Sequence, residues 1–172
     1  MKPESLLIRE EQPGDVSTIS TIIESAFRDH PHSDQTEHLL VDRLRAKGAI
    51  TLSLLAESES QPVAHIAFSK VKIDGKFCGW YGLAPVAVLP ESQSRGIGSA
   101  LIREGLTAIQ TQFNAQGCDV LGDPAYYQRI GFRADPALTL PGFPPEYFMS
   151  LSFTDATPTG VVEYDSAFTE ST

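Results

Sequence analysis

Residues 83–106 read LAPVAVLPESQSRGIGSALIREGL, an apolar run that breaks into a glycine-containing turn and continues as an amphipathic segment. Gln93, Gly96 and Gly98 fall in the spacing Q-x-x-G-x-G, and small residues follow where a helix would begin. The first turn of a helix leaves backbone N–H groups unpaired and carries the positive end of the helix dipole. This stretch therefore predicts a strand, a turn and a helix whose N-terminus can bind an anion such as phosphate.

Pro85 interrupts the apolar run before the turn. Proline has no N–H, so a regular ladder of strand hydrogen bonds cannot continue through it on both edges. A bulge or splay there would leave the amides of Val86 and Val88 free to bond something other than a neighbouring strand. Together with the turn, Pro85 predicts a cleft for a long ligand that is phosphorylated at one end and extended and amide-like at the other.

Two other phosphate-binding motifs do not fit these residues. A Walker loop needs a lysine followed by serine or threonine after its glycines, and no such pair occurs here. The dinucleotide-binding pattern G-x-G-x-x-G needs a third glycine where Leu101 stands, and an acidic residue about 20 positions later at the end of a second strand. The leucine excludes that pattern.

The composition is typical of one soluble globular domain. The chain has 172 residues, of which 41% are hydrophobic and 20% charged, enough to bury a core without disulfides or metal. We therefore expect a single domain over residues 1–172. The formal charge of -9 argues against general affinity for nucleic acid or for an anionic membrane, because both need a basic surface.

Cysteine usage indicates a reducing compartment. Cys78 and Cys118 are too few for a disulfide framework and lie at no metal-ligand spacing, so we expect no metal. Residues 1–15 lack the apolar region of a secretory signal, and no later segment approaches the length of a membrane span. We expect a cytoplasmic protein.

Periodicity and turn residues predict alternating strands and helices, and hence a mixed α/β domain. Strands are expected at residues 6–11, 51–57, 62–73, 79–89, 118–121 and 147–153. Helices are expected at residues 16–27, 35–47, 98–113 and 124–130, with Gly117 ending the third of them. Residues 154–172 are expected to form a tail over the surface.

Two polar side chains lie close to apolar stripes. His65 shares a strand face with Ala67 and Ser69, where it is either a core histidine or a general base or substrate contact. Glu37 lies one turn before Val41, where its carboxylate either faces a cleft or favours the helix N-terminus.

Two motifs together resemble a known family. Residues 93–98, QSRGIG, following 83–90, LAPVAVLP, are similar to the acetyl-coenzyme A signature of the GCN5-related N-acetyltransferases (GNAT). Residues 121–132, LGDPAYYQRIGF, resemble the family's last motif, in which a tyrosine precedes a G-F pair by four residues. The L-G-D-P-x-Y-Y-x-R-x-G-F form and an H-x-A-F-S strand are similar to the YhbS-like bacterial branch. The resemblance covers roughly residues 5–153.

The resemblance implies a GNAT fold. This fold has a single central mixed, mostly antiparallel sheet, splayed at the acetyl-CoA strand, with helices on both faces. Amides from Ser94 to Ser99 would hold the pyrophosphate of acetyl-CoA, and Val86 and Val88 would pair with its pantetheine arm. The implied cofactor-binding residues are Val86, Ala87, Val88, Gln93, Ser94, Arg95, Gly96, Ile97, Gly98 and Ser99.

The resemblance also implies the chemistry. The chain would transfer an acetyl group from acetyl-CoA to a primary amine of a small molecule or peptide, by direct attack of the neutral amine on the thioester. Tyr127 corresponds to the tyrosine that protonates the departing thiolate, as a general acid. Glu37, His65 and Asp123 are the candidates for a base or a substrate contact.

Several alternatives stay open from the sequence. A chain of this family can act as an acyl-CoA-binding sensor or interaction module without transfer activity, or can use a larger acyl group. Neither the acceptor amine nor the general base follows from the fold. The proline-rich last third covers either the domain's own core or that of a partner copy, which would make a homodimer.

Overall fold

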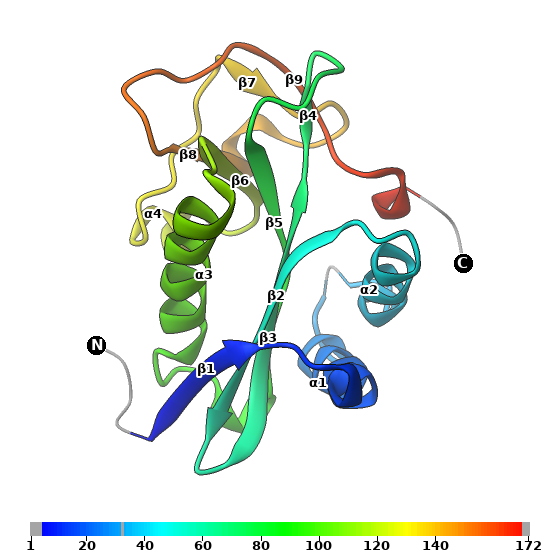
Figure 1. The fold of residues 1–172 in the computed structure, drawn as a ribbon. Helices are drawn as coiled ribbons and strands as arrows, with labels where there is room; N and C mark the ends of the chain where they lie inside the picture. Colours follow the sequence, from blue (N-terminus) through cyan, green and yellow to red (C-terminus); the bar gives the residue numbers. More distant parts are fainter. Residues whose placement is uncertain (1–4, 32, 170–172) are drawn as a thin grey trace.

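The computed structural model describes residues 5–31 and 33–169, and its centre is a six-stranded sheet with helices on both faces (Figure 1). The spatial order of the strands is β1-β2-β3-β5-β6-β8. Their bounds are β1 Leu6–Glu10, β2 Ile50–Ser58, β3 Gln61–Lys70, β5 Trp80–Val88, β6 Gly117–Leu121 and β8 Phe148–Ser152. Neighbouring strands run antiparallel except β5 and β6, which run parallel. The predicted mixed, mostly antiparallel sheet is confirmed.

The helices form a layer on each side of the sheet (Figure 1). Their bounds are α1 Val16–Phe27 and α2 Glu37–Ala46 on one side, and α3 Ile97–Phe113 and α4 Pro124–Gln128 on the other. Helix α1 buries Ile19, Ile22 and Ile23 against the sheet, at the three- and four-residue spacing of an amphipathic helix.

Helix α3 ends at Phe113, as expected, but the residue that ends it differs from the one predicted. Asn114 follows Phe113 in the left-handed conformation and ends the helix, so the prediction that Gly117 does so is wrong. Gly117 instead begins β6, where an added β-carbon would lie 2.3 Å from the Trp80 ring. The glycine is needed there for close packing and has no role in stopping a helix.

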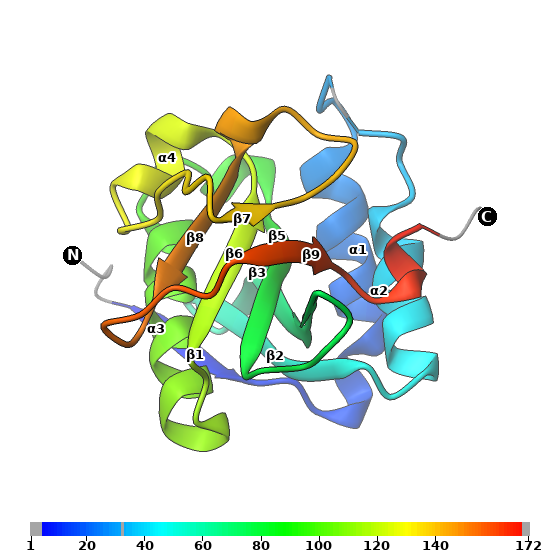
Figure 2. The ribbon, with the colours of Figure 1, turned by 90° about the horizontal axis from the view of Figure 1, so that it is seen from above.

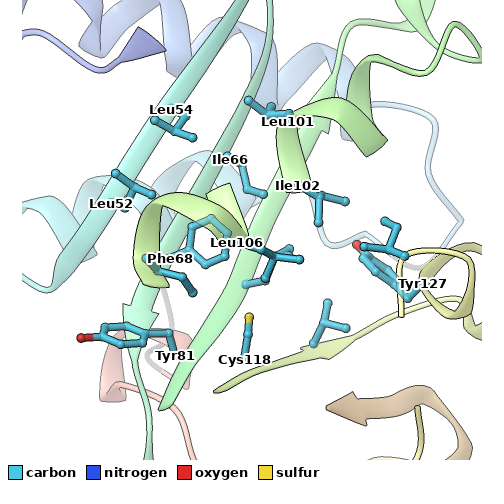
Figure 3. Close-up of a cluster of buried hydrophobic side chains, with 14 of the residues drawn as sticks. Leu52, Leu54, Ile66, Phe68, Tyr81, Leu101, Ile102, Leu106, Cys118 and Tyr127 are labelled. Carbon is cyan, nitrogen blue, oxygen red and sulfur yellow. The ribbon is translucent and has the colours of Figure 1, made fainter. Parts of the chain in front are cut away.

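The main apolar core lies between the sheet and α3. From the sheet it includes Leu52, Leu54, Ile66, Phe68 and Tyr81, and from α3 it includes Leu101, Ile102 and Leu106 (Figure 3). Tyr127 of α4 belongs to the same cluster, so α4 is attached to the α3 side of the sheet. A second cluster lies under α1 and α2, against Leu55 and Ala87 on the opposite face.

A smaller sheet covers one end of the central sheet (Figure 2). It has the order β4-β9-β7, with bounds β4 Lys72–Ile73, β9 Gly160–Glu163 and β7 Leu138–Thr139. Val162 and Ala167 are buried, so the prediction of a surface tail over residues 154–172 is wrong for residues 160–168. Residues 170–172 of that range lie outside the described residues.

None of the helices within the described ranges is both long enough and apolar enough to cross a membrane.

Candidate functional site

Strands β5 and β6 separate soon after they begin. They pair only through Trp80 with Gly117, Tyr81 with Cys118 and Gly82 with Asp119, while β5 continues to Val88. The two strands part just beyond Gly82 and Asp119, at a point that we call the fork. The register against β3 also shifts between Ile66 and Phe68, opposite the cis peptide bond before Pro85. The predicted splay at this strand is therefore present.

The separated part of β5 presents free amides. The Leu89 N–H donates to the carbonyl of Val63 on the β3 side at 2.8 Å. Because N–H groups alternate between the two edges of a strand, the amides of Val86 and Val88 face away from β3. This is the edge from which β6 has parted, so these two amides can pair with an extended ligand.

The turn after β5 leads directly into α3. The Gln93 side chain donates from Nε2 to the Val88 carbonyl at 3.0 Å, which ties the turn to the end of the strand. Gly96 adopts the left-handed conformation with φ 80° immediately before α3. The first hydrogen bond of the helix runs from the Ala100 N–H to the Gly96 carbonyl at 3.0 Å. The amides of residues 97–99 therefore lack intrahelical partners and form an anion-binding helix start.

Helix α4 carries Tyr127 next to this helix start. Asp123 caps α4, since its Oδ1 accepts from the Ala125 N–H at 3.0 Å. Tyr127 is buried, with its ring 5.0 Å from that of Tyr126 and 5.8 Å from that of Phe132. Burial raises the pKa of the Tyr127 phenol well above its ordinary value. The hydroxyl therefore stays protonated at neutral pH, where it can donate a hydrogen bond.

His65 lies on the other face of the sheet, under α1. Its Nε2 is 2.8 Å from Ser53 Oγ, and Ser53 Oγ donates to Glu11 Oε1 at 2.7 Å. Arg45 pairs with Glu11 at 2.9 Å, and these residues line a surface hollow of about 260 Å³. Burial lowers the pKa of His65 to about 4, so the ring is neutral at pH 7. The hydrogen bond with Ser53 occupies Nε2 of the His65 ring, while Nδ1 has no hydrogen-bond partner among the described residues.

Glu37 lies at the first turn of α2 and is partly buried. Its carboxylate accepts from Ser33 Oγ at 2.7 Å. Within residues 5–31 and 33–169, no side-chain hydrogen bond joins Glu37, His65 or Asp123 to one another or to Tyr127. The structure thus places Asp123 at the start of the helix that carries Tyr127, whereas Glu37 lies on α2 and His65 on the opposite face of the sheet.

A buried carboxylate that the sequence did not predict as a site residue lies at the fork of β5 and β6. Asp119 is fully buried, and its Oδ1 accepts from the Tyr164 hydroxyl at 2.6 Å. Burial raises its pKa to about 7, and the Tyr164 hydrogen bond opposes this rise. The available signal was a charged residue within the short apolar strand GCDVL, but nothing in the sequence placed Tyr164 beside it.

Across the described ranges, no three His, Cys, Asp or Glu side chains form a group that could hold a metal ion.

Comparison with known proteins gives one consistent result. A family model described as an acetyltransferase (GNAT) domain matches residues 50–134. The N-acetyltransferase YhbS of Escherichia coli (strain K12) is 34% identical over 170 residues, which cover 95% of this chain and 98% of the relative.

Two solved structures share the fold over nearly the whole chain. A GNAT family acetyltransferase from Brucella melitensis, solved in complex with acetyl-CoA, is 47% identical with a TM-score of 0.85, over 95% of this chain and 97% of that one. YhbS from Escherichia coli, solved in complex with CoA, is 32% identical with a TM-score of 0.88, over 99% of this chain and 96% of that one.

Proposed function

This chain belongs to the GNAT family of acetyltransferases, and on that premise we propose that it transfers an acetyl group from acetyl-CoA to a primary amine of a small molecule or peptide. The observation that carries the proposal is the free edge of β5, where the amides of Val86 and Val88 lead to the unpaired first turn of α3. The relatives solved with acetyl-CoA and with CoA support this assignment.

The donor would be held at two points. The amides of residues 97–99, with Ser94 and Arg95 on the exposed turn before them, suit a pyrophosphate. The amides of Val86 and Val88 suit the two amide groups of a pantetheine arm, which can pair with β5 as an added strand. An amide of β5 would also stabilise the oxyanion that forms when the thioester carbonyl is attacked.

Tyr127 is the proposed general acid. Its protonated phenol is positioned by the capped helix α4 and by the ring contacts with Tyr126 and Phe132. The C–N bond forms as the C–S bond breaks, and the leaving sulfur takes the phenolic proton. The phenol recovers its proton from the nitrogen of the product as that nitrogen becomes an amide.

The acceptor must lose a proton before it attacks. An amine with a pKa of about 10.4 is less than about 0.1% neutral at pH 7, so a proton acceptor is needed. Glu37, His65 and Asp123 are candidates for this role, directly or through water. Each already accepts or shares a hydrogen bond in the structure: Glu37 with Ser33, His65 with Ser53, and Asp123 with the Ala125 amide.

Two measurements test the proposal. Calorimetric titration with acetyl-CoA, propionyl-CoA and succinyl-CoA measures donor affinity and acyl preference, and release of free CoA thiol over a panel of primary amines measures transfer. We expect micromolar binding of acetyl-CoA and amine-dependent thiol release. Binding without thiol release from any amine would favour a sensor, and preference for a longer acyl-CoA would identify a different donor. Absence of binding by all three donors contradicts the proposal.

A further inference from the structure

The ring of Tyr164 covers the closed end of the fork. Gly82 and Asp119 form the last pair before β5 and β6 part. A β-carbon added to Gly82 would lie 2.6 Å from Tyr164 Cε2 and 3.0 Å from Tyr164 Cζ. The ring therefore packs directly against the backbone of β5, and even a methyl group at position 82 would require it to move.

The ring lies on the face of the sheet that points away from α3. Tyr81 and Cys118, which precede the last pair on the two strands, belong to the core under α3. Side chains alternate between the two faces along a strand, so a side chain at Gly82 would point to the opposite face, as that of Asp119 does. Tyr164 occupies this space, and its hydroxyl donates to Asp119 Oδ1 at 2.6 Å. The ring thus reaches from β5 to β6.

Contacts on several sides hold Tyr164 in place. Its ring is in edge contact with that of Phe168, at 5.0 Å between centroids, and packs against an apolar cluster that includes Trp80. The next residue, Asp165, pairs with Lys47 at the end of α2 at 2.6 Å. A ring held by a hydrogen bond, a ring contact and a flanking ion pair has little freedom to move. It can therefore act as a fixed wall at the fork.

The acyl group of the donor is expected at this end of the fork. Along an acyl-CoA molecule, the pyrophosphate is followed by two amides, the thioester and the acyl chain. With the pyrophosphate at the start of α3, an arm that pairs with Val88 and then with Val86 runs back along β5 toward Gly82. Gly82 lies four positions, or about 13 Å, from Val86. The thioester and then the acyl chain therefore extend toward the closed end.

Packing limits the space at the closed end on its other sides. The face toward α3 is filled by the main core, to which Leu106, Cys118 and Tyr127 belong (Figure 3). The end itself is closed by the paired strands. An acyl chain that grows in this direction therefore meets the ring of Tyr164.

We propose that the Tyr164 ring limits the length of the acyl group, so that the fork accepts acetyl and excludes acyl chains of four or more carbons. This inference rests on the proposed function, since it needs a donor thioester in the fork. It makes Tyr164 a specificity-determining residue, contributed by a segment that the sequence suggested was a surface tail.

The test measures the Kd of the full chain for acetyl-CoA, propionyl-CoA and butyryl-CoA by calorimetry, so it needs neither an acceptor nor turnover. The unmodified chain should bind butyryl-CoA at least about tenfold more weakly than acetyl-CoA, with propionyl-CoA between them. Tyr164→Ala should remove this difference, because the two additional methylenes then become buried, which contributes roughly a factor of ten to affinity.

Two control variants separate the ring from its hydroxyl and from aromatic residues elsewhere. Tyr164→Phe keeps the ring, so its ratio of butyryl-CoA to acetyl-CoA affinity should stay within about twofold of that of the unmodified chain. Phe113→Ala removes a 40% exposed ring at the end of α3 and should leave the ratio unchanged.

The outcomes distinguish this inference from the proposed function. Equal affinity of the unmodified chain for acetyl-CoA and butyryl-CoA overturns the inference alone, as does an unchanged ratio in Tyr164→Ala. Absence of binding by all three donors contradicts the proposed function, and this inference with it.

Should Tyr164→Ala not fold, the unmodified chain gives the answer with acetyl-CoA carrying ¹³C in the acetyl methyl group. A nuclear Overhauser effect between that methyl group and the Tyr164 ring protons is expected, with the ring signals assigned by their loss from the tyrosine spectrum of Tyr164→Phe. Its absence while acetyl-CoA is bound overturns the inference.

Discussion

A β-carbon added to Gly98 would lie 2.8 Å from the hydroxyl oxygen of Tyr126. The first turn of α3 therefore meets helix α4 so closely that a side chain at Gly98 would require the Tyr126 hydroxyl to move. Tyr126 is also in edge contact with Tyr127, at 5.0 Å between ring centroids. The second glycine of the turn thus has a packing role that links the proposed phosphate site to the helix carrying the proposed acid.

Gly98→Ala should weaken acetyl-CoA binding by about tenfold, because the added methyl displaces either the helix start or Tyr126. Adding Tyr126→Phe removes the obstructing oxygen and should restore most of the affinity in calorimetric titrations. Gly14→Ala is the matched control, since an added β-carbon there meets nothing within 4 Å. If the double variant does not regain affinity for acetyl-CoA, the contact between residue 98 and the Tyr126 hydroxyl is not the cause of the loss.

Gly96→Val should abolish measurable acetyl-CoA binding. A β-branched residue does not adopt φ 80° without strain of about 1–2 kcal/mol, and its side chain would occupy the anion site. Gly75→Val is the matched control, because Gly75 has φ 81° in open surroundings far from the turn in sequence. Both variants should melt a few degrees lower, and only the first should lose the donor. Retained affinity in Gly96→Val would contradict the pyrophosphate assignment.

Tyr127→Phe should lower kcat by about 100-fold and leave the Kd for acetyl-CoA within about twofold. The ring keeps its contacts with Tyr126 and Phe132, and only the proton donor is lost. Thiol release under saturating donor and amine measures the first quantity, and calorimetry the second. Tyr147→Phe serves as the control, because Tyr147 is 46% exposed. An unchanged kcat would remove Tyr127 from the mechanism.

His65 should make the folded state less stable in acid. Its pKa is lowered to about 4 in the folded protein, mainly by burial, whereas the unfolded chain titrates near 6.5. As pH falls from about 6.5 to about 4, the unfolded state takes up a proton that the folded state does not, so stability is lost. The loss reaches about 3 kcal/mol. Denaturant titrations of the chain and of His65→Gln should give a difference in unfolding free energy that shrinks by this amount over that window.

Asp119 should change the stability of the fold with pH in the direction opposite to His65, over nearly the same pH range. Its pKa is raised to about 7 in the folded protein from about 4 in the unfolded chain, so the folded state holds a proton that the unfolded state has lost. The associated stability is present at low pH and is lost as pH rises from about 4 to about 7. Asp119→Asn should therefore gain stability relative to the unmodified chain, by up to about 4 kcal/mol, between pH 4 and pH 8 in the same titrations. If the difference in unfolding free energy between Asp119→Asn and the unmodified chain does not change with pH, the folded protein does not disfavour the charged form of Asp119.

Local patterns predicted the elements with strong periodicity and clear turn residues. The isoleucines of α1 and the turn at Glu59 and Ser60, both with positive φ, follow from residue spacing and turn chemistry. The two motifs together led to the GNAT family, which the comparisons confirm. The assignment of individual cofactor residues and of Tyr127 remains a prediction.

The features that sequence analysis missed depend on contacts between distant residues. Strands β4, β7 and β9 have two to four residues each, too few to show a period of two, and β4 pairs with β9 across some 90 positions of sequence. The burial of Asp119 likewise depends on Tyr164, 45 positions later. A single aspartate in a short strand does not reveal that partner.

Because β5 and β6 pair over only a short length, the central sheet consists of two parts. Strands β1, β2, β3 and β5 form one part and β6 and β8 the other, and three residue pairs join the two parts. A donor that pairs with Val86 and Val88 would fill the open part of this seam. The substrate would then serve as a structural strand for as long as it is bound, and the continuity of the sheet would be restored and lost once in every catalytic cycle.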